Sequence, residues 1–136
     1  MFKLTSLNVR GLSNFKKRRT IFCWCRKMKS DMIFLQETRS THSTQEVKRH
    51  WEREWGGKML FSHGANNARG VIILVRNGFD YNVDTVKIDS QGRFILVKGK
   101  IQDVEYTVVN IYAPNKDACS RKFSRKICNG SCRNSE

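Results

Sequence analysis

The spacing of hydrophobic residues in the first third of the chain indicates two strands separated by a helix. Residues 2–9 alternate between apolar and polar side chains, which is the period of a strand, and Gly11 interrupts that pattern. Residues 32–37, MIFLQE, form a nearly continuous apolar run, which is typical of a strand covered on both faces. Between them, residues 15–29 place apolar side chains at i, i+4 and i+7, so we expect a helix with one buried face.

A second helix is predicted to begin near residue 43. Ser43 and Glu46 have the spacing of a capping box, in which each side chain satisfies a free backbone N–H of the first turn. Val47, Trp51 and Trp55 then recur at i, i+4 and i+8, the spacing of one helix face. The two glycines that follow end this helix.

The remaining pattern has the period of strands and contains several turn signals. The last two apolar segments would pair as a hairpin around Gln102-Asp103, and a turn at residues 89–92 precedes them. The predicted strands cover residues 58–63, 71–76, 93–101 and 104–112. The order strand, helix, strand, helix and then several strands predicts a mixed α/β (α+β) fold, and 136 residues suffice for one domain.

The charge of the chain indicates an anionic partner. Twenty-six Lys and Arg residues stand against twelve Asp and Glu residues, which gives a formal net charge of +14. A charge of this size suits a nucleic acid, although a membrane surface or acidic small molecules would fit it as well.

The basic residues are concentrated at the start of the chain. Residues 1–30 contain nine basic residues and no acidic one, and residues 16–19 read KKRR directly after Asn14, a candidate N-cap. Cations in the first turn of a helix oppose its dipole. Either a bound phosphate offsets this repulsion or residues 16–19 form a solvated face, and both interpretations stay open.

The cysteines and the apolar runs bear on the compartment. No run approaches membrane-spanning length, and the N-terminal segment does not have the pattern of a secretory signal. We therefore expect an intracellular protein with free thiols and no membrane association. The spacing of Cys23 and Cys25 does not match common zinc sites, and no histidine stands near the other three cysteines, Cys119, Cys128 and Cys132. Residues 116–136, basic and rich in Ser and Cys, are expected to form a weakly ordered tail.

Two polar side chains end neighbouring predicted strands. Asn8 ends the first strand and Glu37 ends the second, with one helix between them. Strands joined by one helix become parallel neighbours whose ends lie on the same side of the sheet. Mg²⁺ prefers one or two carboxylates and keeps coordination places for water and phosphate oxygens. Glu37 is therefore a candidate metal ligand, with a solvated strand end or an ion pair as the alternatives.

The segment VVNIYAPN, residues 108–115, offers further polar groups. Asn110 and Tyr112 lie two residues apart on one strand and so share a face, and Asn115 follows Pro114. A tyrosine packed at a sheet margin is the simpler interpretation. The loop at residues 64–70 carries Asn67 and Arg69, whose donors suit phosphates or bases, although a polar turn is the simpler explanation.

The segments LNVRGL, FLQET, WEREWGG, FSHGANNARGVIILV and VVNIYAPN follow one another in an order and at a spacing that carry a resemblance. The chain resembles the N-terminal half of an endonuclease/exonuclease/phosphatase domain of the DNase I-like fold, over residues 2–115. Within that superfamily it is most similar to the apurinic-type endonuclease domain of LINE-type (non-LTR) retrotransposon polyproteins. The resemblance implies the first half of a four-layer α/β/β/α sandwich, truncated, with residues 1–115 as a partial domain.

The resemblance also implies roles for individual residues. Glu37 matches the Mg²⁺-binding glutamate, with Mn²⁺ as an alternative ion, and Asn8 matches the asparagine beside the metal and the scissile phosphate. Tyr112 matches the tyrosine that contacts this phosphate. Asn110 and Asn115 flank it, and Arg10, Asn67 and Arg69 are further candidates for phosphate or DNA contact. The implied reaction is hydrolysis of a DNA phosphodiester, which nicks target DNA in the nucleus and exposes a 3′-hydroxyl for a downstream reverse transcriptase domain.

A complete domain of this family continues with an Asp-x-Asn segment and a closing Asp-His pair, which this sequence lacks. After Asn115 the chain has one Asp, Asp117, and no His. His63, in FSHG, is expected to be a strand-end residue and not a general base. We therefore expect an inactive chain that leaves one sheet without its partner and is poorly soluble. A basic nucleic-acid-binding module without chemistry and a phosphatase or phospholipase relative are the alternatives.

Overall fold

Two helices and seven strands form the part of the chain that the structure describes. The computed structural model describes residues 2–40, 45–64 and 68–113. In chain order the elements are β1 (Leu4–Asn8), α1 (Phe15–Lys27), β2 (Met32–Gln36), α2 (Gln45–Trp55), β3 (Lys58–Ser62), β4 (Val71–Val75), β5 (Asn82–Ile88), β6 (Phe94–Ile101) and β7 (Val104–Ile111). Within these ranges no helix is long and apolar enough to cross a membrane.

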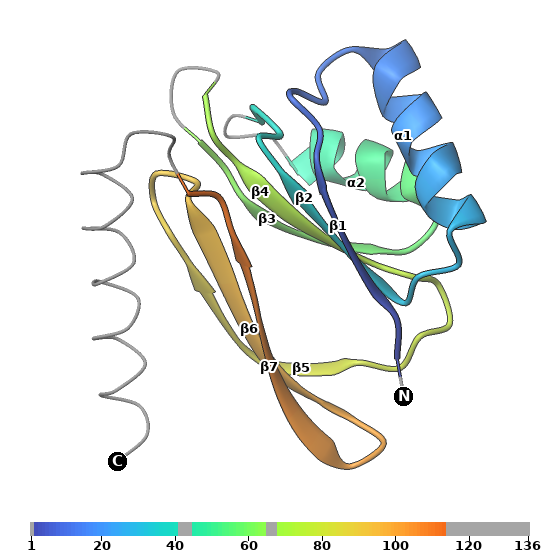
Figure 1. Ribbon diagram of the computed structural model, residues 1–136, viewed down its shortest axis with the longest axis vertical. Coiled ribbons are helices and arrows are strands. Elements are labelled where there is room, and N and C mark those ends of the chain that lie inside the picture. Colours follow the sequence, from blue (N-terminus) through green and yellow to red (C-terminus); the bar gives the residue numbers. More distant parts are fainter. Residues whose placement is uncertain (1, 41–44, 65–67, 114–136) are drawn as a thin grey trace.

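The first sheet has the strand order β1-β2-β4-β3 and is covered on one face by both helices (Figure 1). β1 and β2 are parallel, as the intervening helix predicts, while β4 pairs antiparallel with β2 and β3. The apolar runs of β2 and β4 are buried along almost their whole length. Their alternate residues face the helices, where Leu35 and Leu74 pack against Phe22 of α1 and Trp55 of α2.

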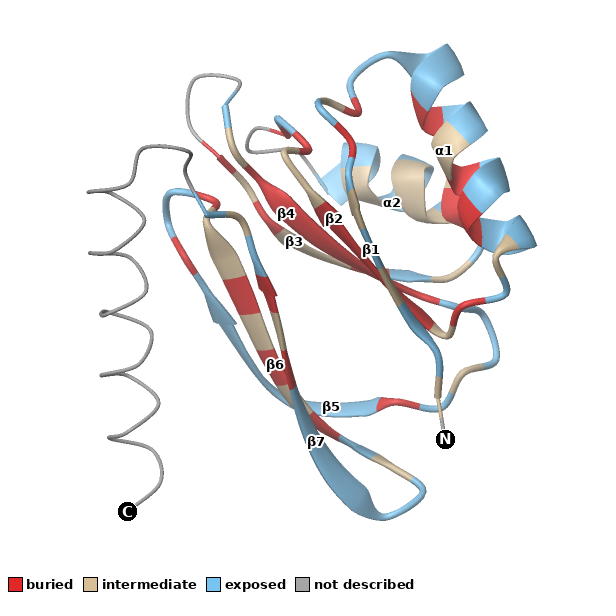
Figure 2. Cartoon of the chain, viewed as in Figure 1, coloured by how far each residue is buried: buried red, intermediate tan, exposed pale blue. Residues whose placement is uncertain are grey.

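The second sheet, β5-β6-β7, is antiparallel and packs on the other face of the first sheet (Figure 1). Phe34 of β2 and Ile73 of β4 meet Ile95 and Val97 of β6 and Val108 of β7 in a second apolar cluster. The described residues therefore form three layers, α/β/β, with both cores in their interior (Figure 2). The expectation that one sheet would lack its partner is wrong, because this chain supplies both sheets.

Each sheet has an outermost strand, here called a border strand, on the side of the sandwich where Asn8 ends its strand. Among the described strands β1 ends the first sheet and β7 ends the second. Phe2, just before β1, packs edge-on against Tyr106 of β7 with ring centroids 5.1 Å apart. Both strands keep exposed apolar side chains, among them Leu4 and Val104. The expectation of poor solubility stays a prediction, and these open edges are now its physical basis.

The sequence pattern predicted each described element except β5. The predicted segments differ from the observed strands and α1 by at most two residues at either end, and the turn at residues 89–92 is present, with Gly92 N donating to Asp89 O at 3.1 Å. β5 has no buried residue along its length. A register shift between Val83 and Thr85 also breaks its alternation, so the strand carries no period-2 signal. Ser43 and the tail at 116–136 lie outside the described residues.

The basic start of α1 contains one buried cation. Asn14 caps the helix, since its Oδ1 accepts from Lys17 N at 3.0 Å. Arg18 is 5% exposed and donates through Nε and Nη2 to the two carboxylate oxygens of Glu54 in α2, at 2.6 and 3.1 Å. Its guanidinium also lies over the Trp51 ring, 4.7 Å from the centroid. Arg18 therefore joins the two helices, while Lys16 and its other basic neighbours are exposed.

We expect the Arg18→Ala substitution to lower the free energy of unfolding by about 3 kcal/mol, because it leaves the half-buried Glu54 without its main partner. Chemical denaturation measures this difference. The hydrogen bond from Arg18 lowers the pKa of Glu54 below its ordinary 4.5. The contribution of the Arg18–Glu54 pair to the free energy of unfolding is therefore complete above pH 4.5 and is lost as the pH falls through the lower pKa of the folded state.

Lys48→Ala is the matched control for this prediction. Lys48 and Glu52 form an exposed i,i+4 pair on α2 with an N–O distance of 4.0 Å. Removing such a pair changes stability by less than about 0.5 kcal/mol. Equal losses for the two variants, or a difference that does not shrink on acidification, would contradict the role given to Arg18.

Candidate active site

The ends of β1 and β2 place Asn8 and Glu37 on the same edge of the first sheet. Asn8 stands opposite Gln36 in the parallel ladder, and Glu37 follows directly. Beyond the strands, Val9 N donates to Gln36 O at 2.9 Å and Gly11 N donates to Glu37 O at 2.7 Å, so the two segments stay paired after β1 and β2 end. Asn8 Oδ1 accepts from Arg10 N at 3.2 Å, which holds its amide at this edge.

The backbone of Glu37 turns its carboxylate toward the second sheet. Leu35 faces the helices and Gln36 faces the second sheet, so a regular strand would turn residue 37 back to the helices. Glu37 has instead a left-handed φ of 53°. Its Oε1 accepts a hydrogen bond from the hydroxyl of Tyr112 at 3.1 Å. The predicted metal ligand and the predicted phosphate-contacting tyrosine therefore lie in direct contact.

Burial and the neighbouring carboxylate both affect the Tyr112 hydroxyl. Burial raises its pKa above the ordinary 10.0, and the hydrogen bond and charge of Glu37 raise it further, because ionisation would place a phenolate beside a carboxylate. The positive charges of Arg69 and Arg39 act in the opposite direction. Tyr112 is thus a neutral donor at physiological pH, and its hydroxyl is bound to the carboxylate of Glu37.

Asn110 does not have the geometry of a phosphate ligand. Its side chain is 1% exposed, and its Nδ2 donates to the backbone oxygens of Leu35 and Ile72 at 3.0 and 2.8 Å. Its Oδ1 accepts from Gln36 Nε2 at 2.8 Å. The expectation that Asn110 binds phosphate or DNA is corrected accordingly, because both polar atoms of its side chain bind the first sheet.

Three arginines with left-handed backbones flank the site. Arg10, Arg39 and Arg69 have φ values of 51°, 52° and 64°, an uncommon conformation for residues with a Cβ. Arg39 N donates to Arg69 O at 2.7 Å, which joins the loops after β2 and before β4. Gly70, next along the chain, has φ 92°, and a Cβ there would collide with Thr38 Oγ1. Such strained conformations cluster at functional sites.

Arg39 was not among the sequence candidates, although it stands two residues after Glu37 and the sequence signal was available. The other predicted DNA-contact residues, Asn67 and Asn115, lie outside the described residues. His63 Nδ1 lies 3.1 Å from Ser40 Oγ, and its ring stacks on Phe61 with centroids 5.0 Å apart. The strand-end role expected for this histidine agrees with these contacts.

The residues at this edge fit a hard divalent cation bound mainly through water and substrate. Glu37 supplies one carboxylate and Asn8 one amide oxygen, which is the ligand type that Mg²⁺ prefers. Within the described ranges no group of three or more His, Cys, Asp or Glu side chains could enclose a metal by itself. A metal held here would therefore need further oxygens from water, phosphate or other parts of the polypeptide.

Comparisons with known proteins bear on the fold of this chain. No family model matches the chain. A transposon TX1 uncharacterized 149 kDa protein of Xenopus laevis is 28% identical over 124 residues, which is 91% of this chain and 9% of that protein. The AP endonuclease LMAP of Leishmania major superposes with a TM-score of 0.62 at 18% identity. The endonuclease domain of TRAS1, a telomere-specific non-LTR retrotransposon, superposes with a TM-score of 0.55 at 14% identity.

This chain has the DNase I-like fold. The predicted fold class is thereby confirmed, and the similarity to a transposon protein and to a retrotransposon endonuclease domain agrees with the resemblance noted from the five sequence motifs. The chain is matched over 83% and 85% of its length but spans only 40% of LMAP and 48% of the TRAS1 domain. The DNase I-like elements present here thus correspond to less than half of each of these solved structures.

We expect Glu37→Gln to lower the pKa of Tyr112 toward 10.0, since the substitution keeps a hydrogen-bond acceptor and removes the charge that opposes ionisation. Ultraviolet titration of tyrosinate measures this change, with Tyr112→Phe identifying the signal. In the unsubstituted chain a raised folded pKa favours the native state below the unfolded value, and this contribution is lost as the pH rises through the folded pKa.

Tyr81 provides an internal control for this titration. Its pKa is also raised, but by burial and by the charge of Asp84. Its hydroxyl donates to the backbone oxygens of Val97 and Tyr106, remote from Glu37. The contact would be contradicted if Glu37→Gln changed the pKa of Tyr81 as much as that of Tyr112, or if it changed neither pKa.

Proposed function

We propose that this chain carries the metal- and phosphate-binding part of a Mg²⁺-dependent DNA endonuclease site, which nicks target DNA for retrotransposition. The observation that carries the proposal is the hydrogen bond between Tyr112 and Glu37, which joins the ends of strands from both sheets beside Asn8. The similarity to an AP endonuclease and to a retrotransposon endonuclease domain supports the same class of reaction.

In the proposed reaction Glu37 and Asn8 would hold Mg²⁺ or Mn²⁺, which when bound would supply Lewis-acid polarisation of a phosphate oxygen and charge stabilisation for the leaving 3′-oxygen. The Tyr112 hydroxyl, which donates to Glu37 in the structure, would then donate its hydrogen bond to a non-bridging phosphate oxygen instead. Arg39 and Arg69, whose charges lower the pKa of Tyr112, would offset the negative charge of the phosphodiester.

We also propose that residues 1–136 alone do not cleave DNA. Hydrolysis needs a general base for the attacking water, and the sequence after Asn115 contains no histidine. Among the described histidines, His63 contacts Ser40 and His50 lies 3.2 Å from Glu54. The remaining acid–base groups would come from other polypeptide, such as the larger product suggested by the 149 kDa transposon relative, which we propose also supplies a reverse transcriptase.

A basic nucleic-acid-binding module without chemistry is the second candidate function. The net charge of +14 and the arginines around the site favour nucleic acid in either case. The two functions differ in the role of Glu37, because a purely electrostatic binder has no use for a carboxylate among cations.

We expect the unsubstituted chain to bind Mn²⁺, and Glu37→Gln to abolish this binding, because it removes the carboxylate that the described residues bring to the site. Paramagnetic resonance of free Mn²⁺ measures the difference. Neither chain should nick supercoiled plasmid in the presence of Mg²⁺. Nicking that depends on Glu37 would overturn the proposed inactivity, and Mn²⁺ binding that ignores Glu37 would favour the non-catalytic module.

DNA binding should depend on the arginines at the site more than on other surface cations. We expect Arg39→Ala to weaken binding of a duplex and to reduce the slope of log affinity against log salt by about 1, as loss of one phosphate contact does. Fluorescence anisotropy over a salt series measures both quantities.

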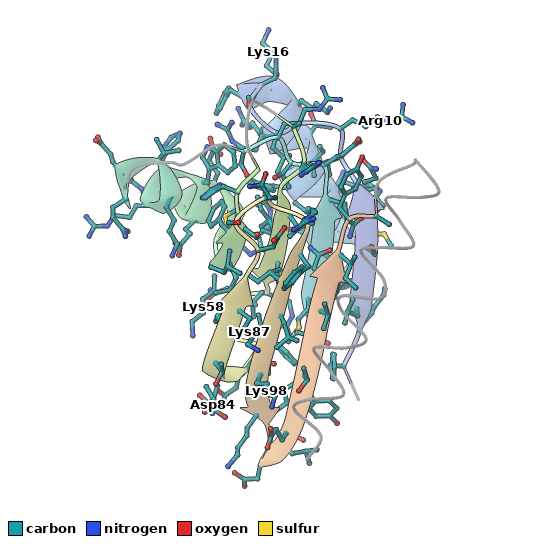
Figure 3. The ribbon with its side chains drawn as sticks, turned by 90° about the vertical axis from the view of Figure 1, so that its left-hand side faces the viewer. Arg10, Lys16, Lys58, Asp84, Lys87 and Lys98 are labelled. Atoms are coloured by element: carbon teal, nitrogen blue, oxygen red, sulfur yellow. The ribbon has the colours of Figure 1, made fainter. Side chains whose placement is uncertain are left out.

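Lys87→Ala is the matched control for Arg39→Ala. Lys87 is exposed on β5 and lies well away from Arg10 and Lys16, which project from the end of the molecule that carries the site (Figure 3). The two variants remove the same charge. Equal effects on the affinity would indicate diffuse electrostatic attraction and no phosphate contact at the site.

A further inference from the structure

Asn110 is a buried amide that connects the two sheets. It lies on the inner face of β7, and its Nδ2 donates to Leu35 O of β2 and to Ile72 O of β4. These two residues are cross-strand partners in the first sheet. One side chain of the second sheet therefore binds the backbone of two adjacent strands of the first, and Gln36 Nε2 holds its remaining oxygen at 2.8 Å.

This connection differs in kind from the packing around it. Val108, two residues earlier on the same face of β7, belongs to the apolar cluster between the sheets. Apolar burial is non-directional, so it holds the sheets together without fixing one offset between them. Hydrogen bonds weaken steeply with distance and angle. The three bonds of Asn110 therefore define where the end of β7 lies over β2 and β4.

The same connection lies next to the candidate site in both strands. Tyr112 follows Asn110 by two residues and lies just after β7, and Glu37 directly follows Gln36, the last residue of β2. The hydroxyl of Tyr112 lies 3.1 Å from Glu37 Oε1. The end of β7 is therefore joined to the end of β2 twice, through Asn110 with Gln36 and through Tyr112 with Glu37. Tyr112 N also donates to Arg93 O at 2.7 Å, which keeps the end of β7 on the second sheet.

We propose that Asn110, held by Gln36, is a positioning residue that sets the end of β7 so that the Tyr112 hydroxyl meets the Glu37 carboxylate. The Glu37–Tyr112 contact is part-buried and consists of one hydrogen bond, which is too weak to align two sheets by itself. Asn110 supplies the alignment from a buried position and leaves Glu37 and Tyr112 available for metal and phosphate. The consequence for metal binding rests on the proposed function, whereas the alignment of Tyr112 does not.

The test uses the full chain with Asn110→Leu, a substitution of similar size that removes all three hydrogen bonds. The ring signals of Tyr112 in a nuclear magnetic resonance spectrum report its surroundings, with Tyr112→Phe for assignment and Glu37→Ala as the reference without the contact. We expect Asn110→Leu to move the Tyr112 signals toward those of Glu37→Ala. We also expect it to weaken Mn²⁺ binding by about tenfold, as loss of a supporting hydrogen bond does at metal sites.

Two further variants separate alignment from general stability. Val97→Ala truncates a fully buried side chain of β6 in the same inter-sheet cluster, and it should lower stability without moving the Tyr112 signals. Gln36→Met removes the bond to Asn110 Oδ1 on a partly exposed side chain while both donor bonds of Asn110 persist. It should move the Tyr112 signals in the same direction and by less, and it serves if Asn110→Leu does not fold.

The outcomes distinguish this inference from the proposed function. If the unsubstituted chain binds no Mn²⁺, the proposed function fails, and the Tyr112 signals still decide on the alignment. If Gln36→Met and a folded Asn110→Leu leave those signals unchanged, the positioning role is overturned. It is also overturned if Val97→Ala moves them as far as Asn110→Leu, because any loosening of the core would then have the same effect.

Discussion

The parallel pairing of β1 and β2 brings two strand ends to one edge of the first sheet, and every group at the candidate site is placed relative to that edge. The pairing puts Asn8 opposite Gln36 and next to Glu37. Helix α1 makes it possible, because a parallel connection needs a crossover, and the apolar face of α1 fixes the helix on the sheet through Phe22 and Cys25. Without this crossover the amide and the carboxylate would end on opposite edges.

The second sheet adds Tyr112 to this edge at the cost of an irregular backbone. Glu37 must leave the strand alternation to reach Tyr112, and it does so with a left-handed φ of 53°. A residue with a Cβ pays for this conformation with roughly 1–3 kcal/mol of strain, which the surrounding contacts must offset. The backbone bonds of Gly11 to Glu37 and of Thr38 to Gly70 hold the segment on both sides.

Much of the fold could be predicted from the sequence because the buried strands have uniform apolar runs and the helices have regular spacing. β5 could not, since its bulge and its exposure remove the alternation. The packing of the two sheets was also missed, because no local pattern states which sheet covers which face. The pairing of the strand that ends at Asn8 with the strand before Glu37 followed from the rule for parallel strands joined by a helix. The roles expected for Glu37 and Tyr112 came from the motif resemblance.

The roles of Asn110 and Arg18 could not be predicted for a different reason. Arg18 stands in a basic run and Asn110 in an apolar strand, and in neither case does the sequence tell whether the polar side chain meets solvent or a buried partner. Asn110 looked like a phosphate ligand because it stands beside Tyr112, yet its amide binds backbone oxygens of the other sheet. Arg18 looked like one cation of a patch, yet it joins the two helices.

The two border strands β1 and β7 have a consequence for how this site can grow. Among the described strands each has one neighbour only, and each carries a site residue at its end, Asn8 on β1 and Tyr112 just after β7. A border strand offers unpaired backbone N–H and C=O groups to any new strand. A strand that docked along either margin would bring its own side chains next to Asn8 or Tyr112 and leave the existing ladder intact. Further side chains could therefore be added to the candidate site by pairing a new strand with β1 or β7.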